Sequence, residues 1–200
     1  MRPLLATVLV LLAACGSAGD ERYRDQLLPL VPGATWDYRT ADRTGAPGAR
    51  TVRVAGEAGG GLVLETRENG SVRRSFLEVQ ALVLAVREVE RAPDGTETEE
   101  LFTPGALRGL ARADLEAGDV FEHRWTGTRE GALAEEIEAR WTVEAVGETV
   151  NVAAGLFEDA VRIRRTQSDG NDALLWYAPG VGLVRARGAE QLELVHWALP

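Results

Sequence analysis

The sequence predicts an all-β fold, an antiparallel meander that curves into a half-barrel or a sandwich. Three observations point to this class. Apolar and polar residues alternate with period two along most of the chain, turn-forming dipeptides separate the alternating runs, and no long stretch has helical periodicity. In the clearest run, from Ile137 to Ala145, every second residue is apolar and the residues between them are charged or Thr. Such a strand has one face in the core and one in water.

Turn-forming dipeptides divide the alternating runs into hairpins. Asn and Asp followed by Gly supply the positive φ that two-residue hairpins need, and Pro followed by Gly presets a type II turn. Consecutive hairpins of this kind predict a meander and not a parallel βαβ arrangement. The four dipeptides are Asn69-Gly70, Asp94-Gly95, Asp169-Gly170 and Pro179-Gly180.

The main helical candidate is the stretch 104–117. Leu107, Leu110 and Leu115 would lie near one face of a helix there. Two glycines within the stretch each lower helix propensity by about 1 kcal/mol relative to Ala. We therefore expect at most a short helix near 104–117.

Residues 1–14 are typical of a signal peptide. Arg2 precedes an apolar run of eleven residues, from Leu4 to Ala14. As a helix this run would span about 16 Å, roughly half of the hydrocarbon core of a bilayer. It is too short for a transmembrane span and suits export.

The tetrapeptide Leu12-Ala13-Ala14-Cys15 resembles the lipobox of bacterial lipoproteins. The resemblance implies that the Cys15 thiol takes a diacylglycerol before cleavage and becomes the lipidated first residue of the mature chain. Two or three fatty acyl chains, palmitate among them, make such attachment stable. The alternative is an ordinary secretory signal with a free thiol at its end. The single Cys of the chain stands at this position, which favours the anchor.

These features divide the chain into three parts. Residues 1–14 form a lipoprotein signal peptide, residues 15–26 form the lipidated Cys and a small, polar, flexible tether, and residues 27–200 form a single β domain. Gly16 follows the Cys where an Asp would, in enteric bacteria, resemble a signal for retention in the inner membrane. We therefore expect the outer membrane in a Gram-negative source, and otherwise the outer face of the plasma membrane.

The composition excludes several classes of protein. The formal net charge is −9, every basic residue is Arg, and no basic block occurs, so we expect no nucleic-acid partner. Removal of the leader with Arg2 leaves a charge of about −10, which anionic head groups repel, so membrane association should come from the lipid. One Cys and two His form neither an internal disulfide nor a Cys/His zinc site, and we expect no metal and no cofactor.

The two halves of the domain share spaced residues that predict an internal duplication. Segment 30–92 would superpose on segment 115–190, strand for strand, and each copy would bury its apolar face against the other. The alternative is a coincidence that strand alternation and frequent Gly produce. Leu30-x-x-Gly33-x-x-Trp36 recurs as Leu115-x-x-Gly118-x-x-Phe121, Thr51-Val52 recurs as Thr142-Val143, and Thr66 and Gly70 recur as Thr166 and Gly170.

Three segments resemble a group of uncharacterised bacterial envelope lipoproteins. They are residues 29–38 (PLVPGATWDY), residues 150–161 (VNVAAGLFEDAV) and residues 176–184 (WYAPGVGLV). The resemblance implies a β-rich lipoprotein and supplies no catalytic residues, because its motifs look architectural. Within the last motif, Gly182 is expected to permit a bulge beside Trp176.

Aromatic residues are the candidates for a ligand pocket. Alternation places Trp125, Trp141 and Trp176 toward the core, and it places His123 on the face of Trp125. Core filling between sheets is the plain interpretation of the tryptophans. If the sheet curves into an open barrel, these residues would line an apolar pocket. His123 would then be a ligand-binding or pH-sensitive group, or else a histidine that packs at the sheet edge with one hydrogen bond.

The remaining polar candidates have plain interpretations. No nucleophile elbow, H-E-x-x-H, P-loop or dinucleotide-binding motif occurs, so no residue is assigned as catalytic. His196 beside Trp197 is a weaker candidate than His123. The loop 168–172 has oxygen ligands for Ca²⁺ but lacks the EF-hand spacing, so we expect a turn. The acidic runs Glu97, Glu99 and Glu100, and Glu135, Glu136 and Glu138, are expected to be solvated strand faces.

The sequence therefore predicts a lipid-anchored cell-envelope protein, most simply a non-catalytic binding or interaction module. Its expected partners are the membrane, through the lipid on Cys15, and either an apolar ligand or another envelope protein. One alternative is a carrier or receptor for an apolar ligand or a lipoprotein, for which a cavity of several hundred Å³ would be the sign. A second alternative is a hydrolase with two facing carboxylates.

Overall fold

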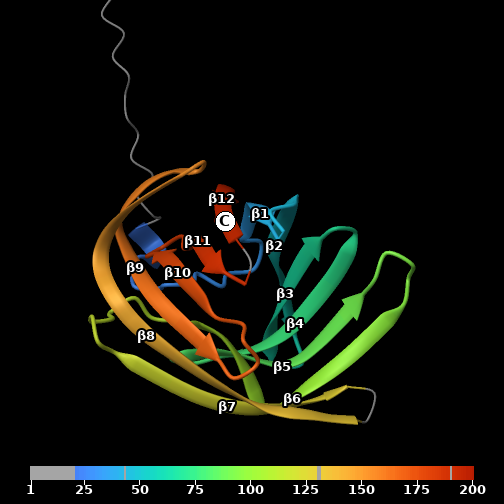
Figure 1. The fold of residues 1–200 in the computed structure, drawn as a ribbon. Coiled ribbons are helices and arrows are strands. Elements are labelled where there is room, and N and C mark those ends of the chain that lie inside the picture. The colour runs from blue at the N-terminus through green and yellow to red at the C-terminus, as the bar shows by residue number, and fades with distance from the viewer. Residues whose placement is uncertain (1–20, 43, 130–131, 190) are drawn as a thin grey trace, which may run out of the picture.

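The computed structural model describes residues 21–42, 44–129, 132–189 and 191–200, and within these residues twelve antiparallel strands form a closed barrel (Figure 1). Each strand pairs with the next along the chain. The last strand pairs with the first over seven residues of β1 and closes the sheet. The strands are β1 (Thr35–Ala41), β2 (Pro47–Ala58), β3 (Gly61–Glu68), β4 (Ser71–Val79), β5 (Leu82–Arg91), β6 (Glu97–Leu110), β7 (Val120–Arg129), β8 (Ala132–Val152), β9 (Gly155–Gln167), β10 (Ala173–Ala178), β11 (Gly182–Gly188) and β12 (Gln191–Ala198).

The predicted antiparallel meander is confirmed, and the structure differs from the prediction in its closure. A half-barrel or sandwich would leave β1 and β12 as edges, but these two strands pair with each other. Both strands carry apolar residues at alternating positions, and pairing buries these residues on the inner face of the barrel. They are Trp36 and Tyr38 on β1 and Leu192 and Leu194 on β12. The four predicted turn dipeptides lie between consecutive strands, and Asn69 and Gly70 have φ values of 50° and 81°.

The helix expected near 104–117 is absent. Residues 104–110 continue strand β6, in which Ala106 pairs with Ala85 and Leu110 pairs with Leu82. The physical reason is that the backbone amides and carbonyls on the second edge of β5 need hydrogen-bond partners. Strand β6 supplies these partners along most of the length of β5. Residues 111–119 follow as an irregular segment. The described part of the chain contains one short 3₁₀ turn, at Glu21–Tyr23.

One end of the barrel is covered by the segment that precedes β1. The amide of Leu27 donates to the carbonyl of Ala111, just after β6, at 2.8 Å, and the amide of Gly180, between β10 and β11, donates to the carbonyl of Gln26 at 2.9 Å. The segment therefore crosses between strands that are not neighbours. Leu27, which is fully buried, fills the space beneath it. We call this end, with residues 25–34, 111–119 and 179–181, the closed end.

The opposite end carries the connection between β1 and β2 and the turns 69–70, 92–96 and 168–172, and we call it the open end. In Figure 1 the β3–β4 and β5–β6 turns lie on the right, and the blue segment that starts at residue 21 lies on the left. The C-terminus lies at the closed end too, because the guanidinium of Arg22 donates to the carbonyl of Pro200 at 2.8 Å.

The interior of the barrel differs between its two sides. Around β1 and β7–β12 most inward side chains are apolar, and the large ones among them include Trp36, Trp141, Ile163 and Leu194. Around β2–β6 many inward positions carry charged or hydroxyl side chains instead. The core is therefore packed on one side, and the other side contains the cavity described below.

The two segments of the predicted duplication each hold five consecutive strands, β1–β5 and β7–β11. A shared turn precedes the first strand of each. The amide of Gly33 donates to Val54 O at 2.9 Å, and the amide of Gly118 donates to Val143 O at 2.8 Å. Both glycines have positive φ, 95° and 100°. The duplication stays a prediction, because a meander of any origin has this strand order.

The signal peptide and Cys15 lie outside the described residues. Within the expected tether, residues 21–26 lie against the closed end, where Gln26 forms a β-bridge with Arg112. No helix in the described ranges is long and apolar enough to cross a bilayer.

Candidate functional site

The structure places His123, Trp125 and Trp141 on the inward face of β7 and β8. The imidazole of His123 stacks on Trp125 with ring centroids 6.0 Å apart. Its Nε2 donates to the carbonyl of Gly105 at 2.7 Å, which is the single hydrogen bond that a histidine packed in a sheet needs. Trp141 is almost fully buried, and its Nε1 has no hydrogen-bond partner. The two tryptophans belong to the packed side of the barrel, whereas His123 is half-buried and lines the depression along β7–β9 described below.

Trp176 lies on the opposite face of the sheet from these three. It pairs with Arg162 and Arg185, whereas the inward residues of β10 are its neighbours Leu175 and Tyr177. Its Nε1 donates to a carboxylate oxygen of Glu148 at 2.9 Å, so the extended end of β8 covers it. The structure thus groups His123, Trp125 and Trp141 on one face and separates Trp176 from them.

The other polar candidates form local contacts. His196 Nδ1 lies 3.6 Å from Asp37, and both side chains are exposed. In the loop 168–172, the carboxylate of Asp169 accepts from the amide and the side chain of Asn171 at 3.0 and 2.7 Å, as in a plain turn. Among the described residues, no three His, Cys, Asp or Glu side chains come together in a way that could hold a metal ion.

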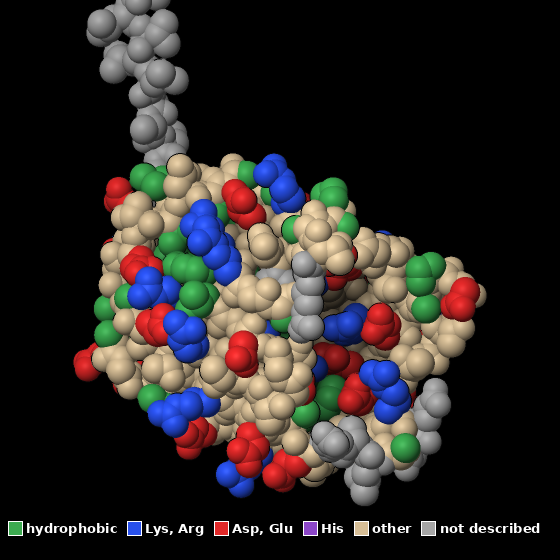
Figure 2. All heavy atoms as spheres, in the orientation of Figure 1, with side chains coloured by type: hydrophobic (Ala, Val, Ile, Leu, Met, Phe, Trp, Pro, Cys, Tyr) green, Lys and Arg blue, Asp and Glu red, His purple; other side chains and the backbone are tan. Residues whose placement is uncertain are grey.

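A charged cavity lies inside the barrel between β2 and β6, toward the open end. Its volume is about 390 Å³. Figure 2 shows acidic and basic side chains gathered in a hollow to the right of centre. None of these residues was singled out as a site by the sequence. The lining residues are Arg50, Val52, Leu64, Thr66, Glu68, Asn69, Ser71, Arg73, Ser75, Leu77, Glu88, Glu90 and Arg108.

Strand register explains why these side chains share the cavity. Arg50 pairs with Glu68 across β2 and β3, and Arg73 pairs with Glu90 across β4 and β5. Directly opposite residues point to the same face of an antiparallel sheet, so each ion pair points inward together. Ser75, on β4, is buried in the cavity wall two residues beyond Arg73.

The ion pairs of the cavity differ in how tightly they are held. Arg50 contacts Glu68 through Nε at 3.0 Å and through Nη2 at 2.6 Å. One carboxylate oxygen of Glu88 accepts from Ser75 at 2.8 Å and from Arg108 at 3.0 Å. These contacts are short and partly buried, which strengthens charge-assisted hydrogen bonds.

The pair of Arg73 and Glu90 is the loosest of the three. A single contact of 3.3 Å joins them, and their side chains are 49% and 38% exposed. An exposed, single-contact pair contributes little to stability, typically well below about 1 kcal/mol. These two charged groups can therefore exchange their partner for a ligand at small cost.

The wall continues past the cavity toward β7. A second hollow of about 160 Å³ shares Arg73, Glu88 and Glu90 with it and adds Glu100 and Arg129. Glu100 lies directly opposite Glu88 on β6, and Arg129 Nη2 contacts Glu100 at 2.9 Å. Of the acidic run at 97–100, Glu100 thus points inward, whereas Glu97 and Glu99 are exposed as expected.

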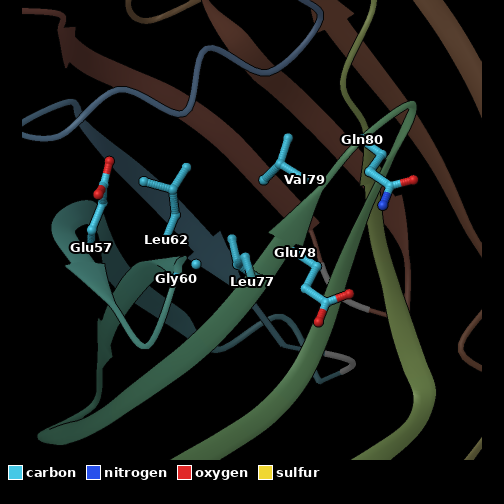
Figure 3. A pocket seen from close by; sticks show the side chains of 8 residues that line it. Glu57, Gly60, Leu62, Leu77, Glu78, Val79 and Gln80 are labelled. Atoms are coloured by element: carbon cyan, nitrogen blue, oxygen red, sulfur yellow. The ribbon is translucent and has the colours of Figure 1, made fainter.

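The floor of the cavity is apolar. Val52, Leu64 and Leu77 line it on its inner side, and Leu77 is almost fully buried. Leu77 also lines a separate surface hollow of about 400 Å³ near the closed end. In Figure 3 the carboxylates of Glu57 and Glu78 lie on opposite sides of that hollow and do not converge. That hollow thus lacks the converging polar groups of a specific site.

A larger depression of about 800 Å³ runs along β7–β9 near the open end. Its charged residues form exposed pairs, Arg124 with Glu138 at 3.1 Å and Arg140 with Glu122 at 2.8 Å. Their side chains are more than half exposed, so water screens them. The charged cavity between β2 and β6 is the better candidate because its groups converge and are less exposed.

The sequence does carry a signal for this cavity. In β4 and β5 charged residues occupy both alternating sets of positions, as in Arg73-Arg74 and in the run from Arg87 to Arg91. A strand that is polar on both faces does not fit a single solid core, but it does fit a barrel whose interior is wet. Charged residues on both faces of β4 and β5 therefore indicate charged groups inside the barrel as well as outside it.

No family model and no curated protein matches the sequence. A solved structure with a similar chain course is that of a "putative lipoprotein" from Parabacteroides distasonis, which is 12% identical in sequence. The match covers 87% of this chain and 99% of that chain, with a TM-score of 0.44. A likeness this distant carries no conclusion about function.

Proposed function

We propose that this protein is a lipid-anchored binding protein of the cell envelope, whose charged cavity holds a small polar ligand. The observation that carries the proposal is the cavity itself: three arginines and three glutamates converge inside a barrel, above an apolar floor. Its volume of about 390 Å³ is within the range of ligand sites, roughly 300–1,000 Å³.

The resemblance to a lipobox supports the lipid anchor, and the fold supports a particular orientation of the barrel relative to the membrane. Glu21, the first described residue, lies at the closed end and is six residues from Cys15. Six residues reach at most about 21 Å when fully extended. A lipid on Cys15 therefore places the closed end beside the bilayer, and the cavity opens away from it, toward the aqueous side.

The lining favours a polar ligand over the purely apolar one of the carrier alternative. A cavity of several hundred Å³ is present, but Arg and Glu line most of its wall. An apolar molecule would remove these charges from water without offering hydrogen bonds, which is unfavourable. The tryptophans that would have lined an apolar pocket lie on the packed side or, for Trp176, outside the barrel.

The anchor is tested by replacing the thiol. Cys15→Ser should move the protein from the membrane fraction to the soluble fraction and leave palmitate unincorporated in metabolic labelling. Cys15→Ala is the matched variant and should behave in the same way. Continued sedimentation of either variant with the membranes would contradict the anchor.

Ligand binding is tested by filling the cavity. Ser71 lines its mouth at the start of β4, so Ser71→Trp would occupy much of the space. Native mass spectrometry of protein from its own host should detect a small bound molecule on the wild type and none on Ser71→Trp. Thermal unfolding of both proteins controls for folding. Wild type that is free of any adduct would count against the proposal.

One observation favours the hydrolase alternative. Glu88 and Glu100 face each other across β5 and β6 at the rim of the cavity, as a pair of catalytic carboxylates would. Each is bound by an arginine, Arg108 for Glu88 and Arg129 for Glu100, at 2.9 Å. Carboxylates that already have arginine partners do not form the pair of groups facing a scissile bond that hydrolysis needs, so binding is the function that we propose.

A further inference from the structure

The charges of the cavity balance. Three guanidinium groups and three carboxylates line it, and each guanidinium contacts one carboxylate. A ligand with one net charge would pair with one member of an ion pair and leave the other unpaired. The charge left over would lose the attraction of its partner in a cavity that is only partly open to water, which is unfavourable. The balance favours a ligand that carries both charges.

Arg73 and Glu90 are the groups that such a ligand would contact. Their ion pair is the longest of the three, and it lies where the two hollows meet. Arg50 and Arg108 are held by shorter contacts to Glu68 and Glu88. A carboxylate on the ligand would accept from Arg73, and an ammonium group would donate to Glu90, so both charges keep an opposite partner.

The space beside this pair determines the size and the polarity of the remaining part of the ligand. Leu64 and Val52 form an apolar floor next to Thr66, which lies opposite Arg73 on β3. At about 30 Å³ per water-sized group, a volume of about 390 Å³ holds roughly a dozen non-hydrogen atoms. An apolar group of four to eight carbons would cover the floor.

We propose that the cavity binds a zwitterion with an apolar side group, such as a branched aliphatic or aromatic α-amino acid. This inference rests on the proposed ligand-binding function and names its ligand class. In an α-amino acid the ammonium and carboxylate groups are attached to one carbon, which matches the short separation of Arg73 and Glu90 on adjacent strands. The side chain then lies on Leu64 and Val52.

Three probes of nearly equal shape test the proposal. L-Leucine carries both charges, 4-methylpentanoate lacks the ammonium group, and 3-methylbutylamine lacks the carboxylate. Isothermal titration calorimetry on the full mature chain in detergent micelles should show leucine binding. Each single-charge analogue should bind at least ten-fold more weakly.

Variants of the two contact residues identify the site. Arg73→Gln and Glu90→Gln should each weaken leucine binding at least ten-fold. The matched controls are Arg74→Gln and Glu99→Gln, one on β4 and one on β6, which change charges on the outer face and should leave binding within two-fold. Thermal unfolding of all four variants shows that each is folded.

The outcomes separate this inference from the proposed function. If 4-methylpentanoate binds as tightly as leucine, the zwitterion inference is overturned and a ligand-binding cavity still stands. If none of the three probes binds at 10 mM, the ligand class is wrong. The Ser71→Trp experiment then decides independently whether the cavity binds anything. Equal losses in the inner and outer variants would also overturn the inference.

Discussion

Replacing Gly182 with Ala should destabilise the barrel through two separable effects. Gly182 has a φ of +112°, where side chains are strained, and a Cβ there would lie 3.2 Å from Nε1 of Trp36 and 3.3 Å from a methyl of Leu28. Trp36 cannot withdraw, because it is fully buried and its Nε1 donates to the carbonyl of Val181 at 2.5 Å. Strain of about 1–3 kcal/mol and crowding of about 1–3 kcal/mol add to roughly 2–6 kcal/mol, or about 4 kcal/mol at the middle of the range.

Two glycines separate these effects. Gly118 has a φ of +100° with nothing within 4 Å of its Cβ position, so Gly118→Ala has strain without crowding. Gly109 lies outside the positive-φ region, and a Cβ there would be 3.3 Å from Leu28, so Gly109→Ala has crowding alone.

Thermal unfolding followed by circular dichroism should give a Tm for Gly182→Ala that is roughly 8–16 °C below wild type, for about 4 kcal/mol at 2–4 °C per kcal/mol. Each control variant should fall by about half of that. A Gly182→Ala loss no larger than that of Gly118→Ala would refute the packing argument.

Three further outcomes follow from single contacts. Burial raises the pKa of Tyr177 to about 12, so the stability that its neutral phenol contributes is lost as pH rises above 10, and Tyr177→Phe should reduce this alkaline loss in pH-dependent urea unfolding. Hydrogen bonds from two arginines hold the pKa of Glu65 below its usual value, so Glu65→Gln should lower stability at pH 7 and differ less from wild type as pH falls below about 4.5. Trp176→Phe removes the hydrogen bond to Glu148 and should cost about 2 kcal/mol in chemical unfolding.

The strands and most turns could be predicted because they depend on neighbouring residues. From Ile137 to Val143 the alternation and the structure agree, and Ala139, Trp141 and Val143 are buried. The agreement ends where a bulge follows Val143, since one extra residue reverses every later position of the pattern. Trp176 shows the limit of alternation, because a residue on the outer face is buried when another part of the chain covers it.

The missed features depend on residues that are far apart in sequence. Leu107 and Leu110 fit one face of a helix, and only the pairing with β5 makes their segment a strand. The charged cavity needs Arg50, Arg73 and Arg108 from three different strands, and the local pattern around each of them resembles a solvated face. The bulge expected at Gly182 beside Trp176 occurs two residues later, and Gly182 instead makes room for Trp36.

The seam between β1 and β12 has a consequence for how the protein is made. Trp36 pairs with Trp197, so the sheet stays open until β12 has been synthesised. During that interval two strand edges with unpaired amides and carbonyls are exposed, which is the condition for edge-to-edge aggregation. Contacts of such large sequence separation also form slowly. Folding of this chain should thus depend on a holdase chaperone more strongly than that of a fold with local contacts, and deletion of β12 should leave the chain insoluble.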